Sequence, residues 1–153
     1  MRTLHIFIAG LVLGGVVVGG LGSVSAQPER RAINLPGRTT QAPFSDAVLA
    51  GDTLYLSGRL GMDPETGQPP AEPRQEARNV LDGIKSVLEE AGMTMDDLVS
   101  VQVFCSDVAH YADFNAVYTS YFTSDPSARA FVGSGALLRG ARFEVMGVAV
   151  RRP

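Results

Sequence analysis

Two charged residues stand inside the two apolar stretches near the C-terminus of this chain. Arg129 lies within residues 127–132 and Glu144 within residues 141–150, and both stretches have the composition of buried β-strands. Arginine and glutamate are rarely buried without a partner, so their presence there needs a cause. An arginine can bind a carboxylate through two parallel hydrogen bonds, and a glutamate can accept or donate a proton in a reaction. The alternative is a structural ion pair at a subunit boundary.

Hydrophobic periodicity predicts the elements that position these residues. Residues 46–50 and 53–58 flank a Gly51-Asp52 turn and are predicted to form a hairpin. The proline-rich segment 61–73 is predicted to be a loop, residues 98–105 a strand, and residues 110–122 a second helix. The first helix begins near Pro73 and ends at Gly92. Its single apolar stripe consists of Ala77, Val80, Leu81, Ile84, Val87, Leu88 and Ala91.

The order strand-strand-helix-strand-helix-strand-strand predicts an α+β single domain. Each helix has one apolar side, so both helices are expected to pack on one face of a mixed sheet. The closing strand is apolar on both sides except at Glu144, and two helices can cover only one face. We therefore expect a second copy of the chain to cover the other face, in an oligomer whose sheets face inward.

The first 26 residues have the layout of a secretory signal peptide. Arg2 precedes an apolar run from about residue 6 to 22, and the run ends in Ser-Val-Ser-Ala at residues 23–26. This pattern predicts export to the periplasm or the medium, with cleavage after Ala26 and no membrane segment thereafter. An uncleaved membrane anchor is the alternative, because the run approaches the roughly 20 residues that span a bilayer. Residues 27–40 are predicted to be an irregular lead-in, and residues 41–153 the folded domain.

Composition restricts the partners and cofactors. The formal net charge of −3 and the pI near 5.3 do not favour nucleic acid, which normally binds to a basic face. The two histidines, His5 and His110, offer no metal cluster, so no metal is predicted. Cys105 has no second cysteine with which to form a disulfide within the chain. It is predicted to be a buried structural thiol; a catalytic cysteine is the alternative, which no histidine pattern supports.

Four separated segments, in the right order, resemble the RidA (YjgF-type) reactive-intermediate deaminases. They are LYLSGRLGMDPETGQ, EARNVLDGIKSVLEEAGMTMDDLVSVQVFCSDVAHYADFNAVYTSYF, SARAFV and RFEVMGVAVRRP. The similarity extends over about residues 41–153. It implies a chorismate-mutase-like fold assembled as a homotrimer, with three active clefts between the subunits. It also implies hydrolysis of short 2-imino acids to 2-oxo acids and ammonia without a cofactor.

The resemblance also implies roles for single residues. Arg129 matches the arginine that holds the substrate carboxylate, and Glu144 matches the glutamate that handles the water. Asn115, in FNAVY, matches an asparagine that lines the cleft. Ser57 and Gly58 match the serine-glycine pair at the end of the second strand. We predict that Arg129 and Glu144 meet across one cleft.

Three features depart from the family pattern. Phe44 stands where many members have a tyrosine, and Phe131 replaces a small residue, commonly cysteine, two positions after the arginine. The loop 133–140 replaces a more polar, proline-containing stretch. These departures leave the predicted chemistry intact and bear on the size of the substrate, with Phe44 and Phe131 as substrate-binding residues.

Two classes of function remain open at this stage. The first is an imine deaminase, and the second is a non-catalytic protein of the same fold that binds small carboxylates or protects other proteins. The presence of Glu144 beside Arg129 favours the deaminase, because a carboxylate-binding protein needs only the arginine. Export favours the second class, because the enzymes that generate reactive imines are usually cytoplasmic.

Overall fold

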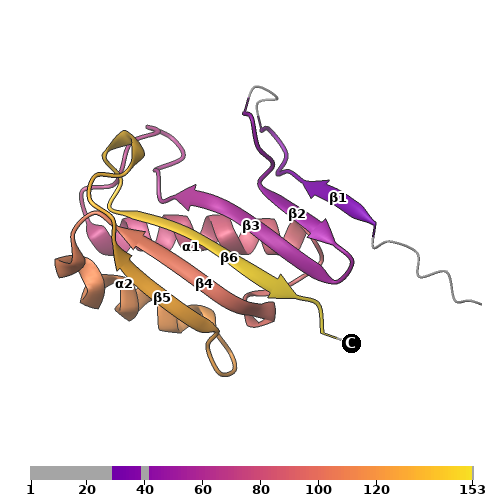
Figure 1. Ribbon diagram of the computed structural model, residues 1–153. Coiled ribbons are helices and arrows are strands. Elements are labelled where there is room, and N and C mark those ends of the chain that lie inside the picture. Colours follow the sequence, from indigo (N-terminus) through magenta and orange to yellow (C-terminus); the bar gives the residue numbers. More distant parts are fainter. Residues whose placement is uncertain (1–28, 39–41, 153) are drawn as a thin grey trace, which may run out of the picture.

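The computed structural model describes residues 29–38 and 42–152, and the predicted leader lies outside them. These residues form one mixed sheet with two helices (Figure 1). The strands are β1 (Arg30–Ile33), β2 (Ala47–Ala50), β3 (Thr53–Leu60), β4 (Leu98–Cys105), β5 (Ala128–Gly133) and β6 (Phe143–Val150); the helices are α1 (Pro73–Glu90) and α2 (Tyr111–Tyr118). A single 3-10 turn, Thr119–Tyr121, follows α2 directly.

The sheet order is β1-β2-β3-β6-β4-β5. Only β4 and β5 pair in parallel among the described strands, and every other neighbouring pair is antiparallel. The predicted order of strands and helices from residue 46 onward is confirmed. The prediction that residues 27–40 are irregular is wrong, because β1 lies in this segment and pairs with β2. Ile33 is the one buried residue of β1, so the segment has no alternating pattern that sequence periodicity could detect.

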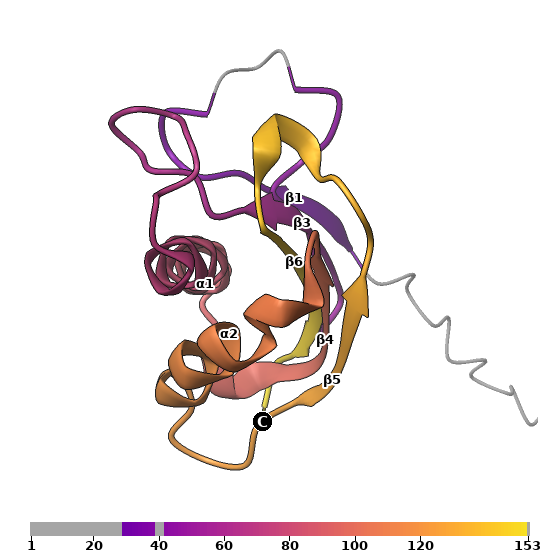
Figure 2. The same ribbon diagram turned by 90° about the vertical axis from the view of Figure 1, so that its left-hand side faces the viewer.

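Both helices pack on the same face of the sheet, which Figure 2 shows from the side. The apolar stripe of α1 accounts for much of the core, since Val80, Leu81 and Leu88 are almost completely buried. The helix begins at Pro73, as predicted, and Gly92 follows its end in the left-handed region at φ 71°. The predicted fold class, α+β with two helices on one face of a mixed sheet, is confirmed.

A buried carboxylate joins α1 to the start of β6. The Glu76 side chain is 0% exposed and accepts hydrogen bonds from the backbone N–H groups of Arg142 and Phe143, at 2.6 and 3.1 Å. The Arg142 guanidinium donates to the other carboxylate oxygen at 2.7 Å. Because every partner is present, this buried charge is fully compensated. Hydrophobic periodicity could not predict this pair, because its members are 66 residues apart in the sequence.

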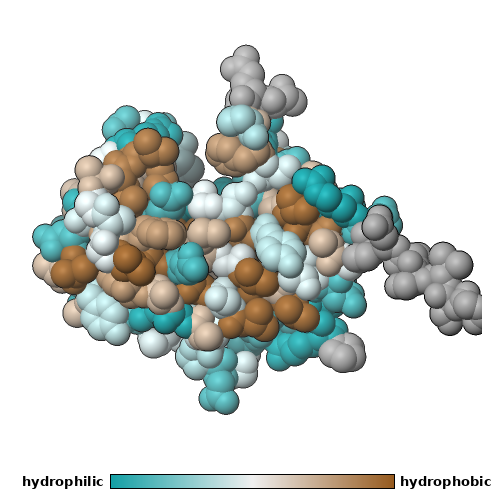
Figure 3. All heavy atoms as spheres, viewed as in Figure 1, coloured by the Kyte–Doolittle hydropathy of each residue, from teal (hydrophilic) through white to brown (hydrophobic). Residues whose placement is uncertain are grey.

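The opposite face of the sheet carries no helix of the described chain. Figure 3 views this face and shows apolar side chains interspersed with polar ones. Its exposed apolar residues include Tyr55, Val132, Met146 and Val150, which come from β3, β5 and β6. Within residues 29–38 and 42–152 no helix combines the length and the apolar character that crossing a bilayer requires.

Candidate functional site

Arg129 projects from β5 toward the helix layer. Parallel pairing places it beside Val101 of β4, which is 2% exposed and part of the core. Its Nη2 atom donates to Oδ1 of Asn115 in α2 at 2.6 Å. The structure therefore brings these two predicted residues together, on the edge strand and on the helix that packs beside it.

Four aromatic rings surround the Arg129 guanidinium, and we call them the aromatic cage. The distances from Cζ to the ring centres are 5.9 Å for Tyr111, 5.7 Å for Phe114, 4.4 Å for Tyr118 and 5.9 Å for Phe131. The first three come from one side of α2, and Phe131 is two positions after Arg129 on the same side of β5. The negative faces of such rings attract a guanidinium. The cage therefore stabilises the charge on its helix side.

On its outer side, Arg129 borders a hollow of about 380 Å³. The hollow is lined by Asn115, Tyr118, Thr119, Pro126, Ser127 and Arg129. Within the described part of the chain, the bond to Asn115 is the only hydrogen bond that the guanidinium makes. A guanidinium has several N–H donors in a planar fork, so Arg129 keeps donors available for a carboxylate in this hollow.

Glu144 lies on the other face of the sheet. It is the cross-strand partner of Leu60 in β3 and Phe104 in β4, and its chain neighbours Phe143 and Val145 are buried on the helix side. A Cβ atom added to Gly58 would lie 2.2 Å from the carboxylate Oε1 of Glu144. Glycine at position 58 therefore leaves the space that this carboxylate occupies. The pairing register of β3 shifts between Leu56 and Arg59, at the Ser57-Gly58 pair.

Ser57 lies within β3, and Phe44 lies just before β2, the strand that pairs with β3. The Ser57 hydroxyl donates to the carbonyl of Ser45 at 2.7 Å. Phe44 is 58% exposed, and its carbonyl accepts a hydrogen bond from Arg38, whose Cζ lies 5.2 Å from the ring centre. Ser57 and Phe44 both line a hollow of about 700 Å³, so these two predicted residues share one surface.

The predicted site residues thus form two groups. The arginine group is Arg129, Asn115 and Phe131, at the β5 edge on the helix side. The glutamate group is Glu144, Gly58, Ser57 and Phe44, around β3 and β6. Within one chain Arg129 and Glu144 project from opposite faces of the sheet. A cleft that holds both would need two copies of the chain, so their meeting stays a prediction.

Comparison with known proteins identifies the family. The family model described as Endoribonuclease L-PSP matches residues 36–151. The chain belongs to the RidA (YjgF) family. It is 39% identical over 112 residues to the bovine 2-iminobutanoate/2-iminopropanoate deaminase, a match that covers 72% of this chain and 82% of the bovine protein.

Solved structures of the RidA family share the fold. The Escherichia coli YjgF gene product superposes with a TM-score of 0.74 at 31% identity, over 80% of this chain and 99% of that protein. The structure of E. coli TdcF with bound serine gives a TM-score of 0.73 at 27% identity, over 80% and 99%. The resemblance inferred from the sequence motifs is confirmed.

The helix over residues 110–122 could be predicted from the sequence, but the aromatic cage could not. Phe114 and Tyr118 are both buried, and the same rings border Arg129. Tyr111 was not singled out. The spacing of Tyr111, Phe114 and Tyr118 indicates a common side of α2. Periodicity cannot predict that β5 lies beside that side of the helix.

Other features of this RidA-family chain are structural. The Cys105 thiol is buried, as predicted, and burial raises its pKa, so the reactive thiolate is disfavoured. No group of three or more metal-ligating side chains lies within the described residues.

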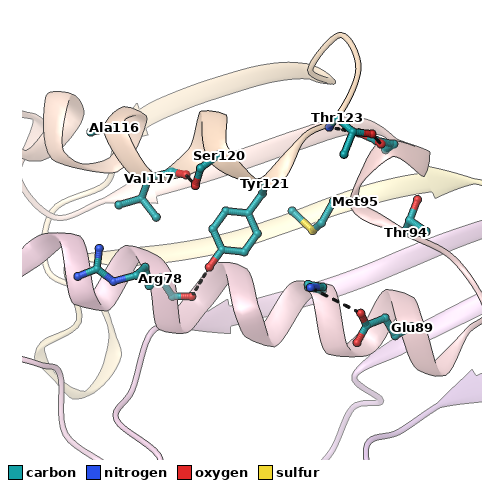
Figure 4. A pocket seen from close by; sticks show the side chains of 11 residues that line it. Arg78, Glu89, Thr94, Met95, Ala116, Val117, Ser120, Tyr121 and Thr123 are labelled. Atoms are coloured by element: carbon teal, nitrogen blue, oxygen red, sulfur yellow. Dashed lines mark hydrogen bonds and ion pairs between the residues drawn. The ribbon is translucent and has the colours of Figure 1, made fainter.

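A hollow of about 660 Å³ between α1 and α2 has no residue of either group in its lining (Figure 4). Tyr121 reaches across it to α1, where its hydroxyl lies 3.3 Å from the carbonyl oxygen of Arg78 (Figure 4) and donates to Oδ1 of Asp82 at 2.7 Å. Lys85 pairs with Glu89 at 3.8 Å. Because these polar groups already have partners within the chain, this hollow is not the candidate site.

Proposed function

We propose that this protein is an imine deaminase that hydrolyses short 2-imino acids to 2-oxo acids and ammonia without a cofactor. The observation that carries the proposal is the Arg129 guanidinium, which is oriented by Asn115 and keeps donors available beside a hollow. The name of the bovine relative supports the reaction, and the serine bound to TdcF supports an amino-acid-like ligand.

Arg129 binds the substrate carboxylate through two parallel hydrogen bonds, which fixes the adjacent imine carbon. Binding in one orientation turns the attack of water into an effectively intramolecular step. Phe131 and Phe44 limit the side chain that fits beside this carbon, so a substrate with a short side chain is expected.

Glu144 accepts a proton from the water that attacks the imine carbon. The new C–O bond forms as the C=N bond becomes a single bond, and the nitrogen takes up a proton from the solvent to give a carbinolamine. Glu144 then returns its proton to the nitrogen. The C–N bond breaks, the hydroxyl loses its proton to the solvent, and the 2-oxo acid and ammonia leave.

We propose that each active cleft is shared between two subunits of a homotrimer. The arginine group lies at an edge strand, and the glutamate group lies on the sheet face that no helix among the described residues covers. A cleft that holds both groups therefore needs two copies of the chain. That face exposes Tyr55, Met146 and Val150, whose apolar area a second copy would remove from water. We also propose, on the pattern of residues 1–26 alone, that the protein is exported and cleaved after Ala26.

The decisive experiment offers freshly generated imines of several amino acids to the wild type and two variants. Glu144→Gln keeps the shape of the side chain but cannot accept a proton. It is expected to bind 2-oxo acids normally and to lose a factor on the order of 10²–10⁴ in rate. Arg129→Ala is expected to lose both binding and turnover, because the substrate carboxylate loses its two parallel hydrogen bonds.

Light scattering and thermal unfolding control for the assembly and folding of each variant. If a folded Glu144→Gln protein hydrolyses imines at the wild-type rate, Glu144 is structural and the catalytic proposal fails. If the wild type binds 2-oxo acids but hydrolyses no imine, the protein is a carboxylate-binding member of the fold.

A further inference from the structure

The guanidinium of Arg129 is held by an aromatic ring as well as by Asn115. Its Cζ atom lies over the Tyr118 ring at 4.4 Å from the ring centre, closer than to the other rings of the aromatic cage. Tyr118 is itself firmly held, because it is 3% exposed and its ring stacks on Phe114 with 5.7 Å between the ring centres. The guanidinium therefore rests on a ring with little freedom to move.

Tyr118 also contacts the strand that carries the arginine. Its hydroxyl and that of Ser127 share a hydrogen bond of 2.9 Å, and Ser127 lies two positions before Arg129. Burial raises the pKa of the Tyr118 phenol, so the hydroxyl keeps its proton at neutral pH. One side chain thus touches the guanidinium with its ring and the entry to β5 with its hydroxyl.

We propose that Tyr118 is a positioning residue of the carboxylate site, which orients the Arg129 guanidinium with its ring and fixes the start of β5 with its hydroxyl. This proposal rests on the proposed role of Arg129 in binding the carboxylate. A guanidinium that is oriented in advance loses less freedom when both N–H groups bind one carboxylate, so it binds more tightly. Tyr118 acts through Arg129 and takes no part in proton transfer.

The test measures the Kd of 2-oxobutanoate and the KM and kcat of imine hydrolysis. Tyr118→Leu removes the ring and is expected to raise Kd and KM roughly 5- to 30-fold, the range that a desolvated cation–π contact supports. Its kcat is expected to stay within about 2-fold of wild type, because Glu144 is untouched. Tyr118→Phe keeps the ring and is expected to raise Kd by about 2-fold only.

Tyr121→Leu is the matched control. Tyr121 lies three positions after Tyr118, but its hydroxyl bonds to Asp82 of α1 and its ring is not part of the aromatic cage. Tyr121→Leu is expected to lower Tm while leaving the Kd of 2-oxobutanoate unchanged. A general loosening of the helix layer would instead raise Kd in both variants and overturn the proposal.

A double-mutant cycle separates positioning from simple destabilisation. In an Arg129→Lys background the planar fork is absent, so adding Tyr118→Leu is expected to raise Kd by less than about 2-fold. An equal loss in both backgrounds, or a Tyr118→Leu protein that binds as tightly as wild type, would overturn the role of Tyr118. A wild type that binds no 2-oxobutanoate would instead overturn the proposed role of Arg129 itself.

Discussion

Glu76 contacts the first residue of β6, and Glu144 belongs to β6. The two residues differ in what surrounds their carboxylates. Glu76 is buried and accepts three hydrogen bonds, two from Arg142 and one from Phe143. Among the residues that the structure describes, no hydrogen bond or ion pair joins the Glu144 carboxylate. The chain itself thus uses the hydrogen-bonding capacity of the Glu76 carboxylate. The hydrogen-bonding capacity of the Glu144 carboxylate stays available to another molecule.

The two arginines of the same region differ in the same way. Arg142 donates to Glu76 and to the carbonyls of Pro70 and Ala71, at 2.8 and 3.0 Å. Arg129 donates to Asn115 alone within the described chain. Charges whose partners are complete stabilise the fold, and charges that keep free donors or acceptors beside a hollow are the candidates for chemistry.

The largest effect is expected at Glu76. Glu76→Ala leaves two backbone N–H groups and one guanidinium without their acceptor and should lower the free energy of unfolding by about 3 kcal/mol, the low end for a broken buried pair. The low end applies because Arg142 is partly exposed and keeps two carbonyl partners. Urea unfolding at matched protein concentration measures this loss.

Glu144→Ala is the control for Glu76→Ala. It should change the free energy of unfolding by less than about 0.5 kcal/mol, as expected for a group without hydrogen-bond or ion-pair partners among the described residues. Equal destabilisation by the two substitutions would remove the distinction between a structural and a chemical carboxylate.

The second prediction concerns the two groups of site residues. Arg129→Ala and Glu144→Gln subunits are co-expressed with different tags, and mixed trimers are purified through both tags. The mixed trimers should recover about a third of the wild-type rate. In each of them, one of the three clefts receives an intact Arg129 from the Glu144→Gln subunit and an intact Glu144 from the Arg129→Ala subunit. Each variant alone is expected to be inactive or nearly so. Imine hydrolysis by the mixed protein is the measurement.

Mixed trimers that stay as inactive as the separate variants would mean that one chain supplies both residues. The two groups would then have to approach each other through a rearrangement of β5 against β6. Light scattering of the same sample checks that the mixed species contains three subunits.

The smallest effect is expected at Phe131. Its ring packs edge-on against Tyr111 at 5.0 Å and Phe114 at 5.6 Å, and it borders the same guanidinium. Phe131→Cys should shift the ratio of kcat/KM between imines with longer and shorter side chains by about 10-fold, in favour of the longer one. Activity itself should persist, since Arg129 and Glu144 are unchanged. If Phe131→Cys leaves the selectivity between imines unaltered, Phe131 is not part of the substrate site.

Much of the fold could be predicted because its elements carry strong local patterns. The apolar stripe of α1 and the Gly51-Asp52 turn each depend on residues that are near in sequence, and both are present in the structure. β1 was missed because one buried residue, Ile33, makes no pattern. The Glu76–Arg142 pair was missed because its members are 66 residues apart, and only packing brings them together.

The amino-acid sequence alone determined the element order from residue 46 onward, the family and the identity of the candidate site residues. It could not determine on which side of the sheet each residue lies. Side chains alternate along a strand, so the side of Arg129 depends on its parallel register with Val101, and that of Glu144 on its antiparallel register with Phe104. These registers are long-range pairings that α1 and α2 select by covering one face. Only the tertiary structure therefore decided that the arginine and glutamate groups lie on opposite faces.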